Sequence, residues 1–127
     1  MVINNLIKPK KVSVIILNWN KKEDSMKCLN SLKSLRYPFY DIVLVDNGSN
    51  DGSVNILKLK FPALKIIENE KNLGCAGGRN VGIRYALKNG ADLVFLLDND
   101  TIIDQNCLSE LSNALEAEDA GIVGPKI

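Results

Sequence analysis

Apolar residues along the chain gather in short runs. Three of these runs, at 12–17 (VSVIIL), 42–45 (IVLV) and 93–97 (LVFLL), are almost continuously apolar. Runs of this length and composition predict strands that are buried on both faces, as in a parallel sheet. A weaker run at 64–67 (LKII) predicts a fourth strand that lies nearer an edge of the sheet.

Between these runs, apolar residues recur at the three- and four-residue spacing of an amphipathic helix. Pro62 and Gly90 are expected to end the second and third helices, and Asp104 is expected to cap the start of the fourth. The positions that define the four helices are Cys28, Leu29, Leu32 and Leu35; Val54, Leu57 and Phe61; Val81, Tyr85 and Ala86; and Leu108, Leu111 and Leu115.

The regular alternation of strand and helix predicts an α/β fold with an open, mostly parallel, Rossmann-like sheet and helices on both faces. Residues 1–11 are interpreted as an N-terminal tail and residues 12–127 as one domain. Ile122 and Val123 are expected to begin a fifth strand. Because nothing follows that strand, the sequence is interpreted as a truncated form of such a fold.

The composition is that of a globular domain and argues against several classes of function. The 127 residues, 46% hydrophobic and 24% charged, suffice for one domain with its own core. The 16 basic and 15 acidic side chains give a net charge of +1, so nucleic acid is not an expected partner. No apolar run approaches the roughly 20 residues of a membrane span, and the N-terminus lacks a signal-peptide pattern, so a cytoplasmic location is expected.

Cysteine and histidine usage restricts the metal chemistry. The three cysteines, Cys28, Cys75 and Cys107, are far apart, and the chain contains no histidine. This pattern argues against a zinc site and against a disulfide framework. A bound metal would have to be held by oxygen ligands, which indicates Mg²⁺ or Mn²⁺.

Polar residues follow three of the predicted strands directly. These segments are 18–20 (NWN), 46–52 (DNGSNDG) and 98–100 (DND). In open α/β sheets, ligands bind at the carboxyl ends of the strands. The three segments are therefore expected to meet in one polar site.

Asp98 and Asp100 give the sharpest chemical indication. Two carboxylates this close repel each other unless a cation lies between them, and a divalent ion with oxygen ligands is the natural partner. Such ions commonly bind substrate phosphates as well. The alternative is that Asp98, Asn99 and Asp100 form an ordinary polar turn.

The segment after the second strand has two expected roles. Asp46 and Asn47 are expected to face a ligand, where a carboxylate can accept a hydrogen bond from a base or a ribose hydroxyl. Asp51 and Ser53 are expected to serve the start of the next helix. The alternative is that the whole segment, which is rich in turn-forming residues, is only a loop.

A glycine-rich segment, 72–80 (NLGCAGGRN), opens the third predicted helix. Backbone amides at a helix start favour anions, and Arg79 could add a charge-assisted contact to a diphosphate. The alternative is that the small residues allow the helix to pack closely on the sheet. Trp19 could stack on a nucleotide base or serve as a partly buried core aromatic.

Taken together, these segments resemble glycosyltransferase family 2, whose members are inverting sugar transferases with the GT-A fold. The matching pieces are 12–20 (VSVIILNWN), 41–53 (DIVLVDNGSNDGS), 72–83 (NLGCAGGRNVGI) and 93–100 (LVFLLDND). They occur in the family's order and cover almost the whole chain from Val12. The forms of the NWN and AGGRN segments are similar to those of rhamnosyltransferase-like members.

The resemblance implies that the chain is the half of the domain that binds a nucleoside diphosphate sugar. It implies that Asp98 and Asp100 bind Mn²⁺ or Mg²⁺, with Asp100 as the direct ligand, and that the ion neutralises charge on the departing diphosphate. It further implies that the base, the ribose and the phosphates are held by Leu17, Asn18, Trp19, Asp46, Asn47, Arg79, Asn80, Asp98 and Asn99. A dTDP- or UDP-sugar is the expected donor.

The resemblance also implies what the chain lacks. The family's catalytic base lies in the second half of the domain, so no base is assigned here and binding without turnover is expected for this fragment. The expected acceptor is a glycan or a lipid-linked molecule in polysaccharide biosynthesis. The expected location of the full-length protein is the cytoplasm, where an anchor in the missing part would place it at the inner face of the membrane.

Three other classes of enzyme fit the sequence less well. A dinucleotide-binding enzyme would need a glycine-rich turn after the first strand, where this chain has Asn18, Trp19 and Asn20. A phosphatase with an Asp-x-Asp-x-Thr motif would need its threonine at the position of Ile102. A sugar nucleotidyltransferase would need a longer basic loop after the first strand. A non-catalytic binding or interaction module remains the alternative from a different class.

Overall fold

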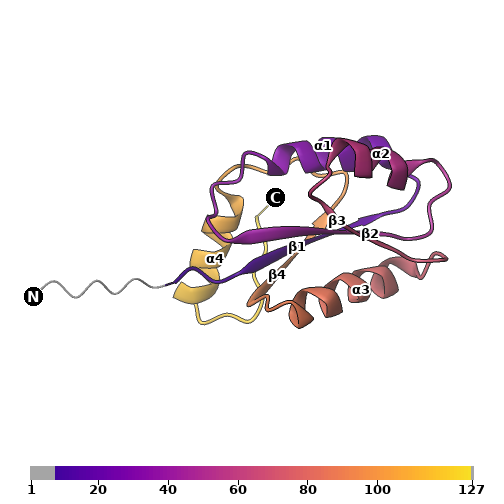
Figure 1. Ribbon diagram of the computed structural model, residues 1–127. Helices are drawn as coiled ribbons and strands as arrows, with labels where there is room; N and C mark the ends of the chain where they lie inside the picture. Colours follow the sequence, from indigo (N-terminus) through magenta and orange to yellow (C-terminus); the bar gives the residue numbers. More distant parts are fainter. Residues whose placement is uncertain (1–7, 127) are drawn as a thin grey trace, which may run out of the picture.

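Parallel strands form the centre of the structure, a computed structural model that describes residues 8–126. Within those residues the sheet has four strands in the order β3-β2-β1-β4, all parallel. Figure 1 shows α1 and α2 above the sheet and α3 below it. The strands are β1 (Val12–Asn18), β2 (Tyr40–Asp46), β3 (Lys65–Glu68) and β4 (Leu93–Asp98), and the helices are α1 (Lys22–Leu32), α2 (Ser53–Lys60), α3 (Gly74–Lys88) and α4 (Cys107–Ala117).

The central strands β1 and β2 are largely buried on both faces, as their continuous apolar runs predict. The same prediction is wrong for β4, which lies at an edge of the sheet and leaves Leu96 44% exposed. Side chains of alternate residues in a strand point to opposite faces, so each strand supplies two cores. On one face, Ile16 and Leu44 lie in a core with residues of α1, α2 and α4. On the other face, Ile15 and Val45 lie in a core with Ala86 of α3. The expected α/β fold with helices on both faces is confirmed.

Helix α3 lies unusually close to the sheet because two of the glycines on its buried face carry no side chain. A Cβ atom added to Gly78 would lie 2.5 Å from Cδ1 of Leu17, and one added to Gly82 would lie 2.5 Å from Cγ2 of Ile15. Both glycines are buried. The packing interpretation of the glycine-rich segment is therefore supported at Gly78, and Gly82, two residues beyond that segment, packs in the same way.

The strand at Lys65–Glu68 is an edge strand, as its weaker apolar pattern indicates. The expected fifth strand is wrong: residues 121–126 form no strand, and the side chain of Ile122 is 92% exposed. This segment lies beside β4 and α4 without forming a backbone ladder with β4. Pro125 has no amide to donate to such a ladder, and Gly121 and Gly124 weaken any extended pairing.

The expected cap of α4 is also wrong. The helix begins two residues later than a cap at Asp104 requires, with Asn106 as the capping position and no side-chain hydrogen bond there. Asp104 instead accepts a hydrogen bond from the backbone amide of Asn106 at 2.8 Å, which closes a turn ahead of the helix.

The expected tail at residues 1–11 lies mostly outside the described residues, which begin at Lys8. Lys10 forms an ion pair with Glu116, and Lys11 forms one with Asp41 at 2.9 Å. In the part of the chain that the structure describes, no helix combines the length and apolar character needed to cross a membrane.

Candidate functional site

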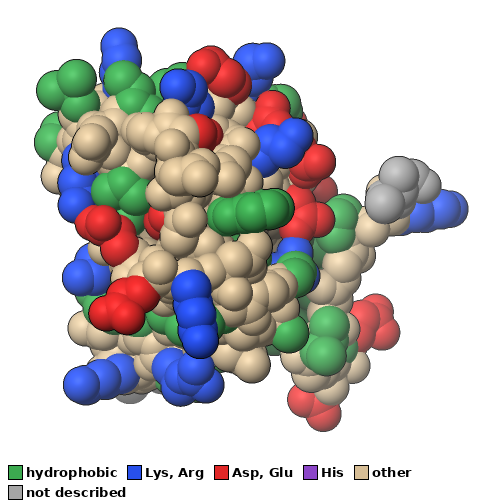
Figure 2. Space-filling model, turned by 90° about the vertical axis from the view of Figure 1, so that its right-hand side faces the viewer, with side chains coloured by type: hydrophobic (Ala, Val, Ile, Leu, Met, Phe, Trp, Pro, Cys, Tyr) green, Lys and Arg blue, Asp and Glu red, His purple; other side chains and the backbone are tan. Residues whose placement is uncertain are grey.

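The carboxyl ends of β1, β2 and β4 lie side by side, because the strands are parallel and in register. Asn18 at the end of β1 pairs with Asp46 at the end of β2, and Leu17 pairs with Asp98 at the end of β4. Figure 2 shows this edge of the molecule, with uncharged polar atoms and backbone over much of its centre and charged side chains around it. The predicted convergence of the three polar segments is confirmed, and we call this region the polar rim.

Asn18 and Asp46 are the buried floor of the polar rim. Both are almost fully buried, and the amide of Asn18 donates to Oδ1 of Asp46 at 2.8 Å. The other contacts of the Asp46 carboxylate come from Ser49, whose hydroxyl donates to Oδ1 at 2.7 Å and whose backbone amide donates to Oδ2 at 2.9 Å. These bonds stabilise a buried carboxylate without a counter-charge.

Asn47 connects the end of β2 to the segment before α3. Its side-chain nitrogen donates to Oδ1 of Asn72 at 2.9 Å and to the carbonyl of Gly74 at 3.0 Å. Its side-chain oxygen accepts from the side chain of Asn69 and from the backbone amide of Leu73, each at 3.1 Å. A primary amide has two donor hydrogens and two acceptor lone pairs, so the hydrogen-bonding capacity of Asn47 is fully used within the protein.

The expected helix-start role of Asp51 is confirmed. Its Oδ1 accepts hydrogen bonds from the backbone amide and the hydroxyl of Ser53, the first residue of α2. Burial alone would raise the pKa of Asp51, but the hydrogen bonds from Ser53, with a further one from the amide of Lys22, outweigh it and lower the pKa.

The Asp98–Asn99–Asp100 segment forms a turn at the end of β4. The backbone amide of Thr101 donates to the carbonyl of Asp98 at 3.1 Å, which closes the turn. The side chains of Asp98 and Asp100 are exposed, whereas Asn99 is half-buried and donates to the hydroxyl of Ser25 at 2.9 Å. The two carboxylates therefore reach the surface while the residue between them is held by α1.

Cys28 of α1 lies beneath the same turn. Its thiol is buried and lies 3.8 Å from the carbonyl oxygen of Asp98, within the distance of a sulfur hydrogen bond. Burial and, to a smaller extent, the negative charge of Asp100 raise the pKa of the Cys28 thiol to about 11. The thiol is therefore protonated at neutral pH and serves as a weak donor.

Arg79, expected from the sequence to contact a diphosphate, lies next to the carboxylates of the turn after β4. Its guanidinium forms an ion pair with Oδ1 of Asp98. Asn80, the following residue in α3, is exposed. An ion pair this exposed contributes at most about 1 kcal/mol, so a cation or a phosphate can displace it at little cost.

The two apolar residues expected at the site have different environments. Leu17 is partly buried and packs against α3, where it contacts the position of Gly78. The side chain of Trp19 is 53% exposed in the loop between β1 and α1, which excludes the core alternative for this aromatic. An exposed indole at the polar rim offers a flat apolar surface.

The donor atoms at this rim fit a hard divalent ion in part. Asp98 and Asp100 provide carboxylate oxygens, the ligands that Mg²⁺ and Mn²⁺ prefer. Among residues 8–126, no group of three or more acidic, cysteine or histidine side chains is arranged to hold a metal. Two protein ligands agree with the usual binding of Mg²⁺, in which water and substrate phosphates complete the coordination shell.

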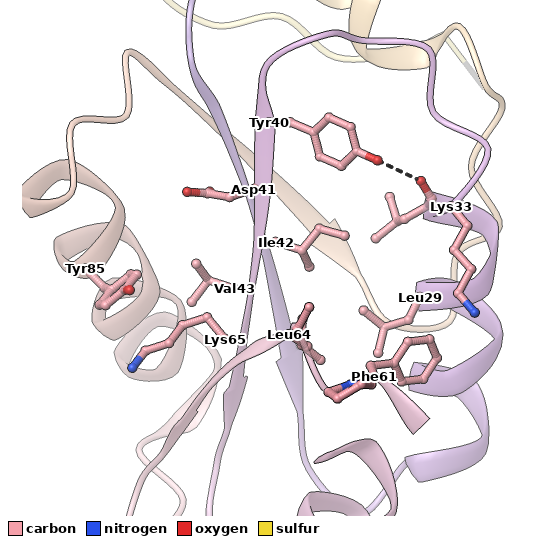
Figure 3. A pocket seen from close by; sticks show the side chains of 13 residues that line it. Leu29, Lys33, Tyr40, Asp41, Ile42, Val43, Phe61, Leu64, Lys65 and Tyr85 are labelled. Atoms are coloured by element: carbon pink, nitrogen blue, oxygen red, sulfur yellow. Dashed lines mark hydrogen bonds between the residues drawn. The ribbon is translucent and has the colours of Figure 1, made fainter. Parts of the chain in front are cut away.

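The larger apolar hollows lie away from the polar rim. A groove of about 550 Å³ opens between α1, α3 and the first half of β2, where β3 is too short to pair with β2. Figure 3 shows Leu29, Ile42, Leu64 and Phe61 around it, and the hydroxyl of Tyr40 directed to the backbone. A polar hollow of about 380 Å³ lies at the rim itself, between the loop after β2 and residues 68–70.

Sequence reasoning missed several polar residues that build the rim from below. Ser25 and Asn69 were missed altogether, and each bonds to a predicted site residue. Ser49 and Asn72 lie within the predicted segments 46–52 and 72–80, but their bonds to Asp46 and Asn47 were not predicted. Their residue types are common in helices and loops, and their partners lie up to 74 positions away in the chain. The polar segments 46–52 and 72–80 gave a local signal for Ser49 and Asn72, whereas nothing near Ser25 in the sequence did.

A family model described as glycosyl transferase family 2 matches residues 13–127. The chain is 34% identical over 121 residues to glycosyltransferase AglE of Haloferax volcanii, an alignment that covers 91% of this chain and 39% of that protein. It is 31% identical over 119 residues to the dTDP-rhamnosyl transferase RfbF of Shigella flexneri, with 90% and 38% covered. The chain thus spans about two fifths of the length of these curated relatives.

The fold is similar to that of the mannosyltransferase PcManGT from Pyrobaculum calidifontis, solved in complex with GDP-Man and Mn²⁺. The TM-score is 0.73 at 25% sequence identity, and the match covers 93% of this chain and 35% of that one. This likeness confirms the expected GT-A architecture for the part of the fold that the chain contains.

Proposed function

The chain belongs to glycosyl transferase family 2, and from that membership we propose that its polar rim binds a nucleoside diphosphate sugar for an inverting, metal-dependent transfer to an acceptor hydroxyl. The observation that supports this most is the parallel register. It brings the ends of β1, β2 and β4 together and leaves Asp98 and Asp100 exposed beside the buried floor of Asn18 and Asp46.

In this proposal Asp98 and Asp100 hold Mn²⁺ or Mg²⁺, with Asp100 as the direct ligand. When bound, the ion supplies positive charge against the diphosphate as it departs. With the ion held at this turn, Asp98 would no longer need its ion pair with Arg79, and the Arg79 guanidinium would be available to contact the base or the diphosphate. The Mn²⁺ in the PcManGT complex supports the choice of ion.

The nucleoside occupies the region between the first two strand ends. Trp19, exposed at the rim, offers a surface on which the base can stack, and Leu17 borders it. Asn18, Asp46 and Asn47 form the floor of the base and ribose site, and their internal hydrogen bonds hold the surrounding loops in place. The remaining substrate contacts are assigned to Asn80 and Asn99.

A dTDP-sugar is the donor we propose first, and a UDP-sugar second. The similarity to the dTDP-rhamnosyl transferase RfbF supports the first choice. The acceptor is a glycan or a lipid-linked molecule of polysaccharide biosynthesis, and the full-length protein works in the cytoplasm at the inner face of the membrane. No residue of this chain is assigned as the catalytic base, so we propose that the chain alone binds donor without transferring the sugar.

The loop after β1 disfavours a sugar nucleotidyltransferase. Only residues 19–21 separate β1 from α1. Their sequence, Trp19-Asn20-Lys21, has no glycine and leaves no room for the long basic loop that a triphosphate would need.

Calorimetric titration tests the proposal directly. The chain is titrated with deoxythymidine, uridine and guanosine diphosphates, with and without Mn²⁺, beside an Asp100→Asn variant. Asp119→Asn is a matched control, since it makes the same chemical change in the exposed segment after α4. We expect one nucleotide to bind only with Mn²⁺, and the Asp100→Asn variant alone to lose that binding. Equal binding by both variants, or no binding by a folded chain, would contradict the proposal.

A further inference from the structure

The polar rim contains a hydrogen-bonded chain that runs from β2 through β1 and α1 to the turn after β4. The amide of Asn99 donates to the hydroxyl of Ser25 at 2.9 Å, and this hydroxyl donates to Oδ1 of Asn18 at 2.8 Å. The amide of Asn18 then donates to Oδ1 of Asp46 at 2.8 Å. Three of these four residues, Ser25, Asn18 and Asp46, are at most 2% exposed.

The carboxylate at one end fixes the direction of every bond in this chain. An ionised carboxylate only accepts hydrogen bonds, so the Asn18 group facing Asp46 has to be its amide nitrogen. The oxygen of Asn18 then faces Ser25 and takes the hydroxyl hydrogen. The lone pairs of Ser25 remain for Asn99, which therefore has to present its nitrogen inward. Bonds aligned in this way strengthen one another.

Among the four residues joined by these hydrogen bonds, Ser25 is the one that lies on a helix and contacts the Asp98–Asn99–Asp100 turn. It shares one face of α1 with Cys28, three residues later, whose thiol lies beneath the carbonyl of Asp98. Both side chains are buried. Helix α1 thus holds the middle residue of the turn and its backbone, while the two flanking carboxylates stay exposed.

We infer that Ser25 is a positioning residue for the metal ligands of this chain. It fixes the side chain of Asn99, and so the turn that sets the separation and direction of Asp98 and Asp100. This inference rests on the proposed function, because it assigns Ser25 a role toward the same donor site. Residues that orient metal ligands commonly contribute tenfold or more to metal affinity.

The test compares Ser25→Ala with Ser25→Thr, which keeps the hydroxyl. The first readout is the affinity of the chain for Mn²⁺ in the presence of the nucleoside diphosphate that it binds. We expect Ser25→Ala to weaken this affinity by roughly tenfold, by the magnitude typical of such supporting residues, and Ser25→Thr to retain it. Without Mn²⁺, neither variant should bind the nucleotide, as is expected for the unchanged chain. Thermal unfolding of each variant checks that it is folded.

Two further measurements separate positioning from general stabilisation. If Ser25 acts through Asn99, the Ser25→Ala/Asn99→Ala double variant should bind Mn²⁺ no more weakly than Asn99→Ala alone. By NMR, the side-chain amide protons of Asn99 should lose protection from solvent exchange in Ser25→Ala, while those of exposed Asn80 stay unchanged.

The outcomes are distinct. If the wild-type chain binds metal and nucleotide and Ser25→Ala binds Mn²⁺ with the same affinity, the inference about Ser25 is overturned while the proposed function stands. An additive loss in the double variant would also overturn it, because Ser25 would then act by another route. A wild-type chain that binds no metal with any nucleotide would overturn the proposed function, and the inference with it.

Discussion

Replacing Gly82 by alanine measures how closely α3 packs on the sheet that carries the site. The added methyl group would lie 2.5 Å from Cγ2 of Ile15 and 3.1 Å from Cγ2 of Val45. Non-bonded carbons prefer separations of about 3.5–4.0 Å, so the helix or the sheet would have to move by about 1 Å. Ile15 and Val45 are fully buried and β-branched, and therefore have few alternative rotamers.

Two opposing terms set the magnitude. Alanine is favoured over glycine in a helix by about 1 kcal/mol. Overfilling a packed core costs about 1–3 kcal/mol, and the contact with Ile15 belongs in the middle of that range. The net effect is a loss of about 1 kcal/mol in the free energy of unfolding, or roughly 3–5 °C in melting temperature for a domain of this size.

Urea unfolding followed by circular dichroism measures this change. Gly121→Ala is the control, because a Cβ there meets no atom within 4 Å and the residue lies outside the helices. In an Ile15→Ala background the clashing methyl group is gone, so Gly82→Ala should become neutral or stabilising. A Gly82→Ala protein as stable as the wild type in the original background would refute the close packing of α3.

Three further predictions follow from single residues. Exposed Cys75 should react with Ellman's reagent in the native protein. Cys28 is buried and its pKa is raised to about 11, so it should react only after unfolding. Equal reaction rates of the two thiols in the native protein would contradict the burial of Cys28. Asp51→Asn should lower the free energy of unfolding by about 0.3–1 kcal/mol at neutral pH, because the amide keeps an acceptor oxygen but loses the negative charge at the start of α2. The folded-state pKa of Asp51 lies below its ordinary value of 3.8, so this stabilisation is present above pH 3.8 and is lost in strongly acidic buffer. In urea unfolding, the difference in stability between Asp51→Asn and the wild type should therefore vanish in acid. A difference that does not depend on pH would refute the role of the Asp51 carboxylate. Asn47→Ala should lower the free energy of unfolding by about 1–3 kcal/mol, since it removes four hydrogen bonds of a buried amide whose partners, in residues 69 and 72–74, are half-buried or exposed. Urea unfolding measures the change, and an unchanged free energy of unfolding would show that water replaces the amide fully.

The sequence predicts the strands of this protein better than the contacts that support its candidate site. The buried strands were predictable because a strand covered on both faces has to be continuously apolar, as in Val12–Asn18. Their parallel register then implied that residues after each strand would meet, and Asp46 and Asp98 do lie at one edge. The prediction of a strand at Ile122 and Val123 was wrong because two apolar residues do not reveal whether the segment pairs with the edge of the sheet at β4.

The supporting contacts of the rim could not be predicted, for a different physical reason. A serine within a helix, such as Ser25, carries no sequence signal of a functional role. Nothing near it in the sequence indicates that its hydroxyl bonds to both Asn18 and Asn99. The two interpretations of the glycine-rich segment also required the structure. The distance from Gly78 to Leu17 supports the close-packing interpretation. No contact in the described residues tests whether the amides at the start of α3 bind an anion.

Paramagnetic broadening by Mn²⁺ in NMR spectra of the chain tests the donor site most directly. The chain is titrated with its nucleoside diphosphate and substoichiometric Mn²⁺, and Mg²⁺ serves as the diamagnetic reference. We expect the amide signals of Trp19, Arg79 and Asp100 at the polar rim to broaden first, and those of Asn89 and Gly90, at the other end of α3, to stay sharp. Broadening centred away from the Asp98–Asn99–Asp100 turn, or none with any nucleotide, would contradict a metal-dependent donor site at the carboxyl ends of these strands.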